Sequence, residues 1–392
     1  MDIVTFNGKK AVFSLIAIIA VVSIIGLVAF SGGTQMASAA KGGDSGVVRV
    51  GWISDLSGPF SKFGAKEAGL LAVERINSAG GINGKRLELV MEDGKGNGRD
   101  AVTAMQKLIN VDGMRIVLGG HNTPESTSIA PIAEANRVLM LASITTTPAL
   151  TNAGDYVFRT SPVSTILSEM TADAAFNKLG YRRFAVISEQ TEYALPIAEK
   201  FRQKIESYGG TVVAFESFAP GTTDFRTILA LVRDKNPEAL FLSAHGTESG
   251  YSLMKQIREA GLRQQLFANE ATTIQVNIDR IPGAYEGLIT ASPDFNREAP
   301  KTREFIEAYK KKYGVSDLPY GVWTAETYDG VMIMADAIAK NGTDIEKIKQ
   351  YLYGLRDYDG VSGKISIDSS GDGVRKYGLK IVRDGKPVDY KG

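Results

Sequence analysis

Two short segments combine backbone amides with hydroxyl side chains in a way that suits a carboxylate. Residues 121–125 (HNTPE) follow an apolar run and open an expected helix, with Thr123 as the N-cap and Pro124 at the first helical position. Free amides and a hydroxyl at such a helix start form a cradle for a carboxylate. A second hydroxyl-rich turn, 144–148 (ITTTP), follows the next apolar run. These threonines would serve equally well as caps and turn formers, and one helix start can do both.

Residue usage excludes several kinds of chemistry. The 392 residues include no cysteine, which removes disulfides, thiolate metal sites, cysteine nucleophiles and a lipid-modified N-terminal cysteine. Two histidines, His121 and His245, are too few for an imidazole-rich metal cluster. The formal net charge of +1 implies no sequence-wide attraction to nucleic acid or acidic lipid. We therefore expect no metal, no cofactor and no nucleic-acid partner.

Motif spacing argues against an enzyme. The sequence contains neither G-x-S-x-G nor H-E-x-x-H. Residues 80–85 (GGINGK) are one residue short of a phosphate loop, and Arg86 stands where that loop needs a hydroxyl. Residues 368–373 (DSSGDG) lack the later bidentate glutamate of a calcium loop. We interpret the first as a helix stop with a turn and the second as a polar turn, and we expect no enzymatic activity.

The N-terminal region has the features of a segment that contacts the membrane. Residues 11–30 form an apolar run of about 20 residues, long enough to cross a bilayer as a helix. Two lysines precede it, which favours export of the rest of the chain from the cytoplasm. Residues 37–39 (ASA) fit a signal-peptidase site, so cleavage and an uncleaved anchor both stay open. Residues 1–46 are thus a signal peptide or anchor plus a tether, and the remainder is expected to be periplasmic or otherwise extracytoplasmic.

From Val47 onward, β-rich runs alternate with amphipathic stretches, which is typical of parallel sheets covered by helices on both faces. In the first unit, 47–53 predicts a strand, helical spacing follows from 65 to 76, and Gly80-Gly81 end the helix. The remaining strand candidates are 87–91, 115–118, 138–142, 184–188, 211–215, 239–243 and 288–291. The chain length suggests two such α/β units.

Breaks in the alternation predict that the chain passes three times between two lobes. They lie at 156–164, 291–300 and 360–363. Three crossings make both lobes discontinuous and hinge-linked, which suits closure over a ligand. The expected division is 47–162 with 291–361 for lobe 1, and 163–290 with 362–392 for lobe 2.

A series of segments resembles the leucine/isoleucine/valine-binding type of periplasmic receptor. Residues 50–91 contain LSGPFSKFG, a helix and NSAGGINGK, and the likeness continues through 139–151, 188–193, 224–231 and 256–270. Each motif alone is weak, but their order and spacing identify the chain as similar to this family. The resemblance implies the type I periplasmic-binding-protein fold, in which each lobe is a mostly parallel sheet flanked by helices and three crossovers form the hinge.

The resemblance also implies roles for individual residues. An amino acid is a zwitterion whose two charges both lose water on closure. Thr123 and Thr146 would donate side-chain hydrogen bonds, with Ile144 contributing its backbone, and Glu270 would pair with the ligand ammonium. Tyr193 would close over the ligand. Phe63 stands where relatives often have tyrosine, which indicates a more apolar pocket or a different ligand.

Less specific candidates are Thr145 in the second hydroxyl turn and several residues near strand ends, where ligands gather in open α/β sheets. The latter are Trp52, Asp55, Asn122 and His245. Ordinary structural roles are also open. Glu270 would then be a solvated loop acid, the aromatic residues would pack in the core, and His121 would be a satisfied structural histidine.

The expected function is that of an extracytoplasmic solute-binding protein. It would capture a branched-chain or related amino acid between the lobes and dock, as a monomer, on the permease subunits of an ABC-type uptake system. Alternatives are a ligand-sensing receptor domain for an amide, a urea-like solute or an aromatic acid, and a periplasmic enzyme. A sugar-repressor-like regulator would need a DNA-binding helix pair at the N-terminus, where the apolar run stands.

Overall fold

The first sheet has five parallel strands in the order β2-β1-β3-β4-β5. A computed structural model describes residues 46–245 and 248–391 of the chain. The strands are Val47–Ser54 (β1), Arg86–Asp93 (β2), Ile116–Gly119 (β3), Leu139–Ala142 (β4) and Val157–Arg159 (β5). Apolar runs form the central strands because both faces of the sheet are covered. The four strands predicted up to residue 142 are confirmed.

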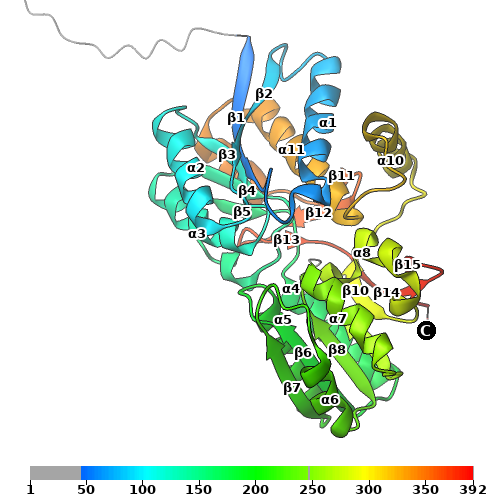
Figure 1. Ribbon diagram of the computed structural model, residues 1–392. Coiled ribbons are helices and arrows are strands. Elements are labelled where there is room, and N and C mark those ends of the chain that lie inside the picture. The colour runs from blue at the N-terminus through cyan, green and yellow to red at the C-terminus, as the bar shows by residue number, and fades with distance from the viewer. Residues whose placement is uncertain (1–45, 246–247, 392) are drawn as a thin grey trace, which may run out of the picture. The chain divides into compact units, whose positions relative to one another are not determined.

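Helices cover both faces of this sheet, and each face has its own apolar cluster. In Figure 1, α1 and α11 lie on one side of the strands and α2 and α3 on the other. These helices are Ala65–Ser78 (α1), Gly98–Asn110 (α2), Thr123–Ala135 (α3) and Val322–Asn341 (α11). Two further helices pack on the α1 and α11 side, Pro300–Tyr313 (α10) and Ile345–Tyr353 (α12).

Close packing of α1 on β1 depends on one glycine. Gly69 of α1 lies over the indole ring of Trp52 in β1, where an added β-carbon would come within 1.7 Å of a ring carbon. After α1, Gly80 and Gly81 both adopt positive φ, and the Gly81 amide donates to the carbonyl of Ile76. The helix therefore ends as predicted, because glycine adopts this conformation without steric cost.

The second sheet has seven strands in the order β15-β14-β10-β9-β8-β6-β7. Five of them run parallel, and β14 and β15 are antiparallel additions at one edge. The strands are Arg183–Glu189 (β6), Thr211–Phe218 (β7), Ala239–Ser243 (β8), Gln265–Ala268 (β9), Ile289–Pro293 (β10), Tyr377–Arg383 (β14) and Lys386–Asp389 (β15). The four strands predicted between residues 184 and 291 are confirmed.

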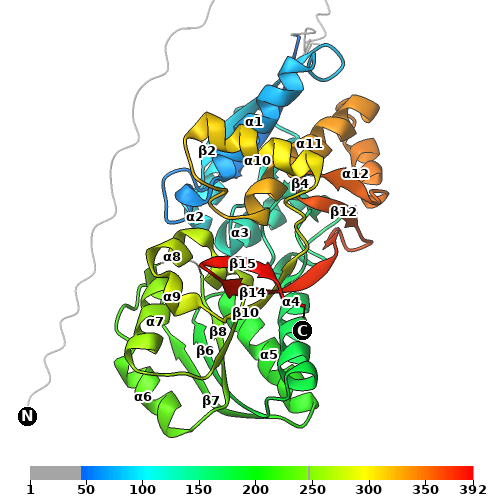
Figure 2. The same cartoon turned by 90° about the vertical axis from the view of Figure 1, so that its right-hand side faces the viewer.

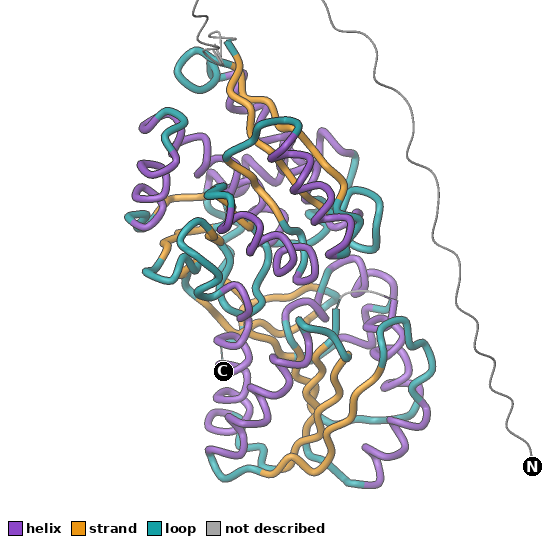
Figure 3. Tube along the Cα trace, turned by 90° about the vertical axis from the view of Figure 1, so that its left-hand side faces the viewer, coloured by secondary structure: helices purple, strands orange, loops and turns teal. Residues whose placement is uncertain are grey.

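Helices also flank the second sheet, α4 and α5 on one face and α6 to α9 on the other (Figure 2). They are Ser164–Asp173 (α4), Ala194–Ser207 (α5), Arg226–Asp234 (α6), Glu248–Glu259 (α7), Gln275–Arg280 (α8) and Pro282–Tyr285 (α9). The tube in Figure 3 shows the same layering of strands between helices. The predicted fold class, two mostly parallel sheets flanked by helices, is confirmed.

Short elements complete the fold. A π-helical turn, Ala174–Lys178 (η3), extends α4, and single 3-10 turns lie at Ser61–Phe63 (η1), Pro148–Leu150 (η2) and Glu270–Thr273 (η4). A small antiparallel sheet is formed by Tyr358–Gly360 (β11), Gly363–Ile367 (β12) and Gly373–Val374 (β13).

The chain passes between the elements of the two large sheets at three places. They lie between β5 and α4, between β10 and α10, and between β13 and β14. Ile365 and Ile367 of β12 belong to the same apolar cluster as Phe158 of β5. The segment 360–363 thus lies within the small sheet. The lobe division stays a proposal. We propose that the second segment of lobe 1 begins after Pro293, where residue 291 was predicted, and ends at Val374, where residue 361 was predicted.

The described residues, 46–245 and 248–391, belong to one compact unit. The predicted membrane segment 11–30, the cleavage motif 37–39 and most of the tether lie outside the described residues. Within 46–245 and 248–391, no helix combines the length and apolar character needed to cross a membrane.

Candidate functional site

One small cavity brings together most of the residues suggested as ligand contacts, with the exception of Trp52 and Asp55. It is lined by Phe63, Asn122, Thr123, Ile144, Thr145, Thr146, Tyr193, His245 and Glu270, and also by Phe60, His121, Tyr320 and Trp323. Most of these residues follow the carboxyl ends of β3, β4, β8 and β9, so both large sheets contribute. The cavity offers about 40 Å³ to the centres of water molecules. Ligand binding by these residues remains a prediction.

The helix start at α3 differs by one residue from the prediction. Asn122, and not Thr123, is the N-cap, because the Asn122 side chain accepts a hydrogen bond from the Glu125 amide at 3.0 Å. Thr123 is the first helical residue, so its amide has no carbonyl within the helix to which it can donate. The Asn122 side-chain nitrogen is buried and lacks a partner among the described residues. The carboxylate cradle thus keeps two free donors at the cavity.

The buried Glu125 side chain holds the start of α3 in place through hydrogen bonds to backbone amides. Its carboxyl oxygens accept hydrogen bonds from the amides of His121, at 2.7 Å, and Gly96, at 3.0 Å. Burial raises the pKa of Glu125 to about 7, against the lowering effect of these two amides. Gly94 lies so close that an added β-carbon would meet the Glu125 carboxyl at 2.2 Å. This acid lay within the predicted motif, but its supporting role was not predicted.

The second hydroxyl turn is held by polar contacts on both sides. The Thr145 hydroxyl contacts the Ser126 hydroxyl at 2.7 Å, which ties the turn to α3. Arg159, almost fully buried, donates to the carbonyls of Thr145, at 3.4 Å, and Thr147, at 2.5 Å. These contacts fix the residues on either side of Thr146.

Glu270 is a buried acid with one oxygen free. It is 5% exposed at the start of η4, and one carboxyl oxygen accepts a hydrogen bond from the Tyr193 hydroxyl at 2.9 Å. The other oxygen, Oε2, has no partner among the described residues. Burial raises the pKa of Glu270 to about 7, although its own backbone amide and the hydroxyls of Tyr193 and Thr146 lower it. This carboxylate is therefore placed to accept a cation inside the cavity.

The two histidines have different surroundings. The Nδ1 of His121 lies 3.1 Å from the Ser54 hydroxyl, while Nε2 is buried and unpartnered among the described residues. Burial lowers the pKa of His121 to about 4, so the ring is neutral at pH 7. His245 places its backbone amide 3.0 Å and its Nδ1 3.3 Å from the Glu189 carboxyl. In the described part of the chain, no group of three or more His, Cys, Asp or Glu could hold a metal ion.

Aromatic rings form most of the remaining wall. Phe63 lies 4.7 Å from Tyr320 and Tyr193 lies 4.4 Å from His245, measured between ring centroids. The Phe60 ring lies between these two pairs, with its centroid 5.5 Å from the ring centroids of both Phe63 and His245. Sequence analysis missed Phe60, Tyr320 and Trp323. Phe60 lies within the quoted LSGPFSKFG motif, whereas Tyr320 and Trp323 come from a distant segment without a comparable signal.

Two suggested residues, Trp52 and Asp55, do not line this cavity. Trp52 is occupied in packing against Gly69. Asp55 accepts hydrogen bonds from the amides of Gly58, at 2.5 Å, and Phe60, at 2.8 Å. It therefore shapes the loop that carries Phe60 and does not face the cavity. The calcium-like segment is a polar turn, in which Asp368 accepts from the amides of Ser370 and Asp372.

The polar turns of two helix-covered sheets meet at one cavity. This cavity offers hydrogen-bond donors to a carboxylate and an unpaired acid to a cation, which is typical of a solute-binding protein. The sequence profile of the periplasmic binding protein family matches residues 47–384, and the chain belongs to this family. The predicted relationship to the type I, branched-chain amino acid group of these receptors is confirmed.

Similar proteins cover most of the chain. A leucine-, isoleucine-, valine-, threonine- and alanine-binding protein of Pseudomonas aeruginosa is 26% identical over 330 residues, 83% of this chain and 87% of that protein. The Leu/Ile/Val-binding protein of Escherichia coli is 26% identical over 83% of this chain and 88% of its own. A crystal structure of a leucine-binding protein from Thermotoga maritima has a TM-score of 0.79 at 26% identity and covers 88% of this chain and 97% of that one.

Proposed function

We propose that the protein is the extracytoplasmic solute-binding component of an ABC-type uptake system, and that it captures a branched-chain or related α-amino acid in this cavity. The free oxygen of Glu270 is the observation that carries the proposal. The names of the similar proteins from Pseudomonas aeruginosa and Escherichia coli point to the same class of ligand.

The polar groups of the cavity match the two charges of a zwitterion. Buried polar atoms without partners are costly, and three of them surround this space: Glu270 Oε2, Asn122 Nδ2 and His121 Nε2. An ammonium would satisfy the acid, and a carboxylate would accept from the Asn122 amide, the Thr123 amide and the neutral imidazole. Ligand entry would thus offset costs that the empty protein bears.

Capture requires no chemical step, and we expect no turnover. We further propose that the filled protein docks as a monomer on permease subunits in the membrane, and that the N-terminal segment contacts the membrane as a signal peptide or an anchor. The hydroxyl turns, the buried acid and the family relationship support capture and delivery.

The decisive variant is Glu270→Gln, which keeps the shape of the side chain and removes its charge. We expect calorimetry at pH 8 to show about 100-fold weaker binding of the amino acid, because a charge pair in a desolvated site is lost. Glu206→Gln, at an exposed position on α5, is the matched control and should leave affinity unchanged. Melting of each ligand-free variant checks the fold.

Wild-type protein should be stabilised by about 2.7 kcal/mol at a ligand concentration of 100 times Kd. Unchanged amino-acid affinity in Glu270→Gln would refute the ammonium assignment. Tighter binding of an aromatic acid without an amine, or conversion of the ligand to another compound, would favour one of the alternative functions instead.

A further inference from the structure

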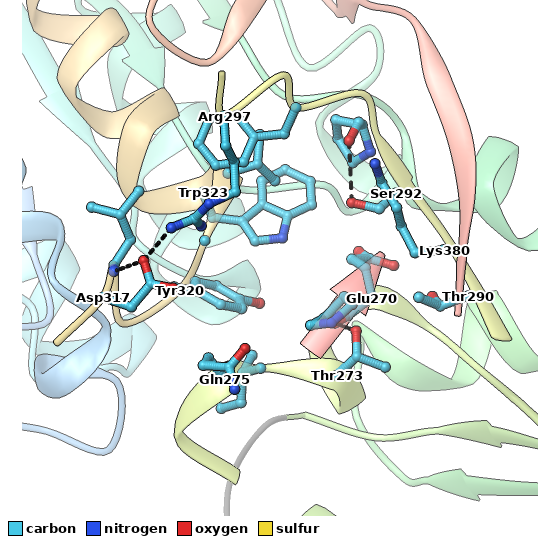
Figure 4. Close-up of a pocket in the computed structure, with 17 residues that line it drawn as sticks. Glu270, Thr273, Gln275, Thr290, Ser292, Arg297, Asp317, Tyr320, Trp323 and Lys380 are labelled. Atoms are coloured by element: carbon cyan, nitrogen blue, oxygen red, sulfur yellow. Dashed lines mark hydrogen bonds and ion pairs between the residues drawn. The ribbon is translucent and has the colours of Figure 1, made fainter. Parts of the chain in front are cut away.

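A second, larger cavity adjoins the first and shares three lining residues with it: Glu270, Tyr320 and Trp323. Figure 4 shows this second cavity, with the Tyr320 hydroxyl and the Trp323 indole turned toward Glu270. We propose that it receives the end of the ligand's side chain, and that the ligand is an α-amino acid whose side chain ends in an oxygen acceptor, a carboxamide or a carboxylate. This inference rests on the proposed function and, within its ligand class, selects a related amino acid with a polar side-chain end in place of a branched-chain one.

The sizes of the two cavities require such a division of the ligand. The first offers about 40 Å³ to water centres, which is room for roughly three waters. Its aromatic wall is closely packed, with Phe63 only 4.7 Å from Tyr320. An ammonium, a carboxylate and the carbon between them fill that space. The second cavity offers about 130 Å³ and begins at the same glutamate, so a side chain has room to continue there.

Hydrogen-bond donors line the second cavity. Neither the Tyr320 hydroxyl nor the Trp323 indole nitrogen makes a hydrogen bond to another group in the described part of the chain. Burial raises the pKa of the Tyr320 phenol, and the charge of the nearby Glu270 adds to this effect. Ser292 donates only to the carbonyl of the next residue, at 3.3 Å, a long contact that a ligand oxygen could replace.

The balance of charge favours an acceptor and disfavours a second ammonium on the ligand. Four charged side chains line the cavity: Glu270, Asp317, Arg297 and Lys380. Arg297 is paired with Asp317, and the α-ammonium would neutralise Glu270. Lys380 then remains, with its side chain only 12% exposed, and its partner Asp389 lies outside the cavity and is 65% exposed. A ligand oxygen could approach the Lys380 ammonium from the cavity side, whereas a second ammonium on the ligand would be repelled by it.

Calorimetry on the intact chain would test this with three ligands of similar length: glutamine, glutamate and norleucine. We expect glutamine or glutamate to bind at least about tenfold more tightly than norleucine, because apolar binding leaves the donors unpaired. Trp323→Phe keeps a ring without the N–H, and Lys380→Met removes the ammonium. Each substitution should weaken binding of the preferred ligand about fivefold or more and change the affinity for norleucine less than about twofold.

Lys301→Met is the matched control, because Lys301 also forms an ion pair, with Asp359, but does not line either cavity. A stronger effect of Lys380→Met on glutamate than on glutamine would assign the acceptor as a carboxylate, and the reverse would assign it as a carboxamide. Tighter binding of norleucine or leucine, or an equal loss for all ligands in the variants, would overturn the inference while leaving the proposed function intact. Failure of every amino acid to bind would overturn both.

Discussion

At the scale of single residues, the protonation of Glu270 governs the site. Its pKa of about 7 means that the empty protein holds a mixture of neutral and ionised carboxyl groups near neutral pH. An ammonium pairs only with the ionised form. Binding therefore competes with a proton, and the unpartnered Oε2 is where this competition takes place.

We predict that amino-acid affinity falls by up to about tenfold for each pH unit below 7 and levels off above pH 8. Calorimetry between pH 5.5 and 8.5 would measure the affinity. Repeating the titration in buffers of different ionisation enthalpy would detect proton release on binding. His121, with a pKa of about 4, stays neutral over this range. The pKa of Glu125 is also about 7, so the affinity of the wild-type protein is compared with that of Glu270→Gln at each pH, since both proteins retain Glu125. A wild-type profile no steeper than that of the variant would contradict the prediction.

The raised pKa of Glu270 also makes the unfolding free energy depend on pH. The folded-state pKa of Glu270 is raised above its ordinary value of 4.5, so between pH 4.5 and 7 the folded protein holds a proton that the unfolded chain has lost. This group's contribution to the unfolding free energy is full below pH 4.5 and is lost as pH rises through about 7. A ligand ammonium restores stability at the higher pH, where the carboxylate is ionised.

Sequence reasoning selected most of the residues that line the first cavity, whose role as ligand contacts stays a prediction, and it erred where neighbouring residues are chemically alike. Threonine and asparagine are both good N-caps, so Asn122 and Thr123 could not be told apart without the backbone. Tyr320 and Trp323 lie about 50 residues beyond Glu270, and only folding brings them to the cavity.

At the scale of elements, Arg159 at the end of β5 connects the hydroxyl turn with the C-terminal part of the chain. Its Nε donates to Asp372 at 2.7 Å and its Nη2 to the Thr151 hydroxyl at 2.8 Å. The same guanidinium holds the carbonyls of Thr145 and Thr147. A planar group with several donors is suited to this arrangement, which a single ammonium cannot reproduce.

We predict that Arg159→Lys keeps the ion pair with Asp372 but lowers the unfolding free energy by about 2 kcal/mol. The same substitution should weaken amino-acid binding about tenfold. Urea unfolding and calorimetry would measure the two effects. Arg182→Lys is a control, because Arg182 also donates to backbone carbonyls but contacts Phe176 and Tyr181, away from the cavity. Equal changes in affinity for the two variants would show that Arg159 does not position the turn.

The contact between α1 and β1 gives a test in which the sign of the effect is informative. In an exposed helix, Gly→Ala stabilises by about 1 kcal/mol. Gly69→Ala should instead destabilise by roughly 1–3 kcal/mol, because the methyl group would overlap the Trp52 ring. Gly283→Ala in α9, where nothing lies within 4 Å of the added carbon, should be neutral or stabilising. Thermal unfolding of both variants would decide, and a stabilising Gly69→Ala would contradict this packing.

At the scale of the whole molecule, apolar runs were sufficient to predict the parallel strands and the fold class. Parallel strands covered on both faces are continuous apolar segments, and these stand out in a sequence. The hairpin of β14 and β15 was missed because charged residues interrupt the half-buried, partly apolar β14, and the four residues of β15 are all exposed. Its turn did carry a signal: Asp384 and Gly385 both have positive φ, as Asp-Gly favours in a two-residue hairpin.

The third crossing was harder to place for a related reason. The segment 360–363 contains two glycines and looks like a linker, yet it is the turn between β11 and β12. Only the burial of Ile365 and Ile367 against the first sheet shows that the chain has not yet left it. Tertiary packing, and not local composition, sets that boundary.

The proposed function depends on recognition of both charges of an α-amino acid by the first cavity. Calorimetry at pH 8 with the preferred amino acid and with its α-hydroxy acid, which replaces only the ammonium by a hydroxyl, tests it most directly. We predict that the hydroxy acid binds about 100-fold more weakly, because the ionised Glu270 would face a hydroxyl in place of a cation. Equal affinity for the two compounds would show that Glu270 does not pair with the ligand ammonium.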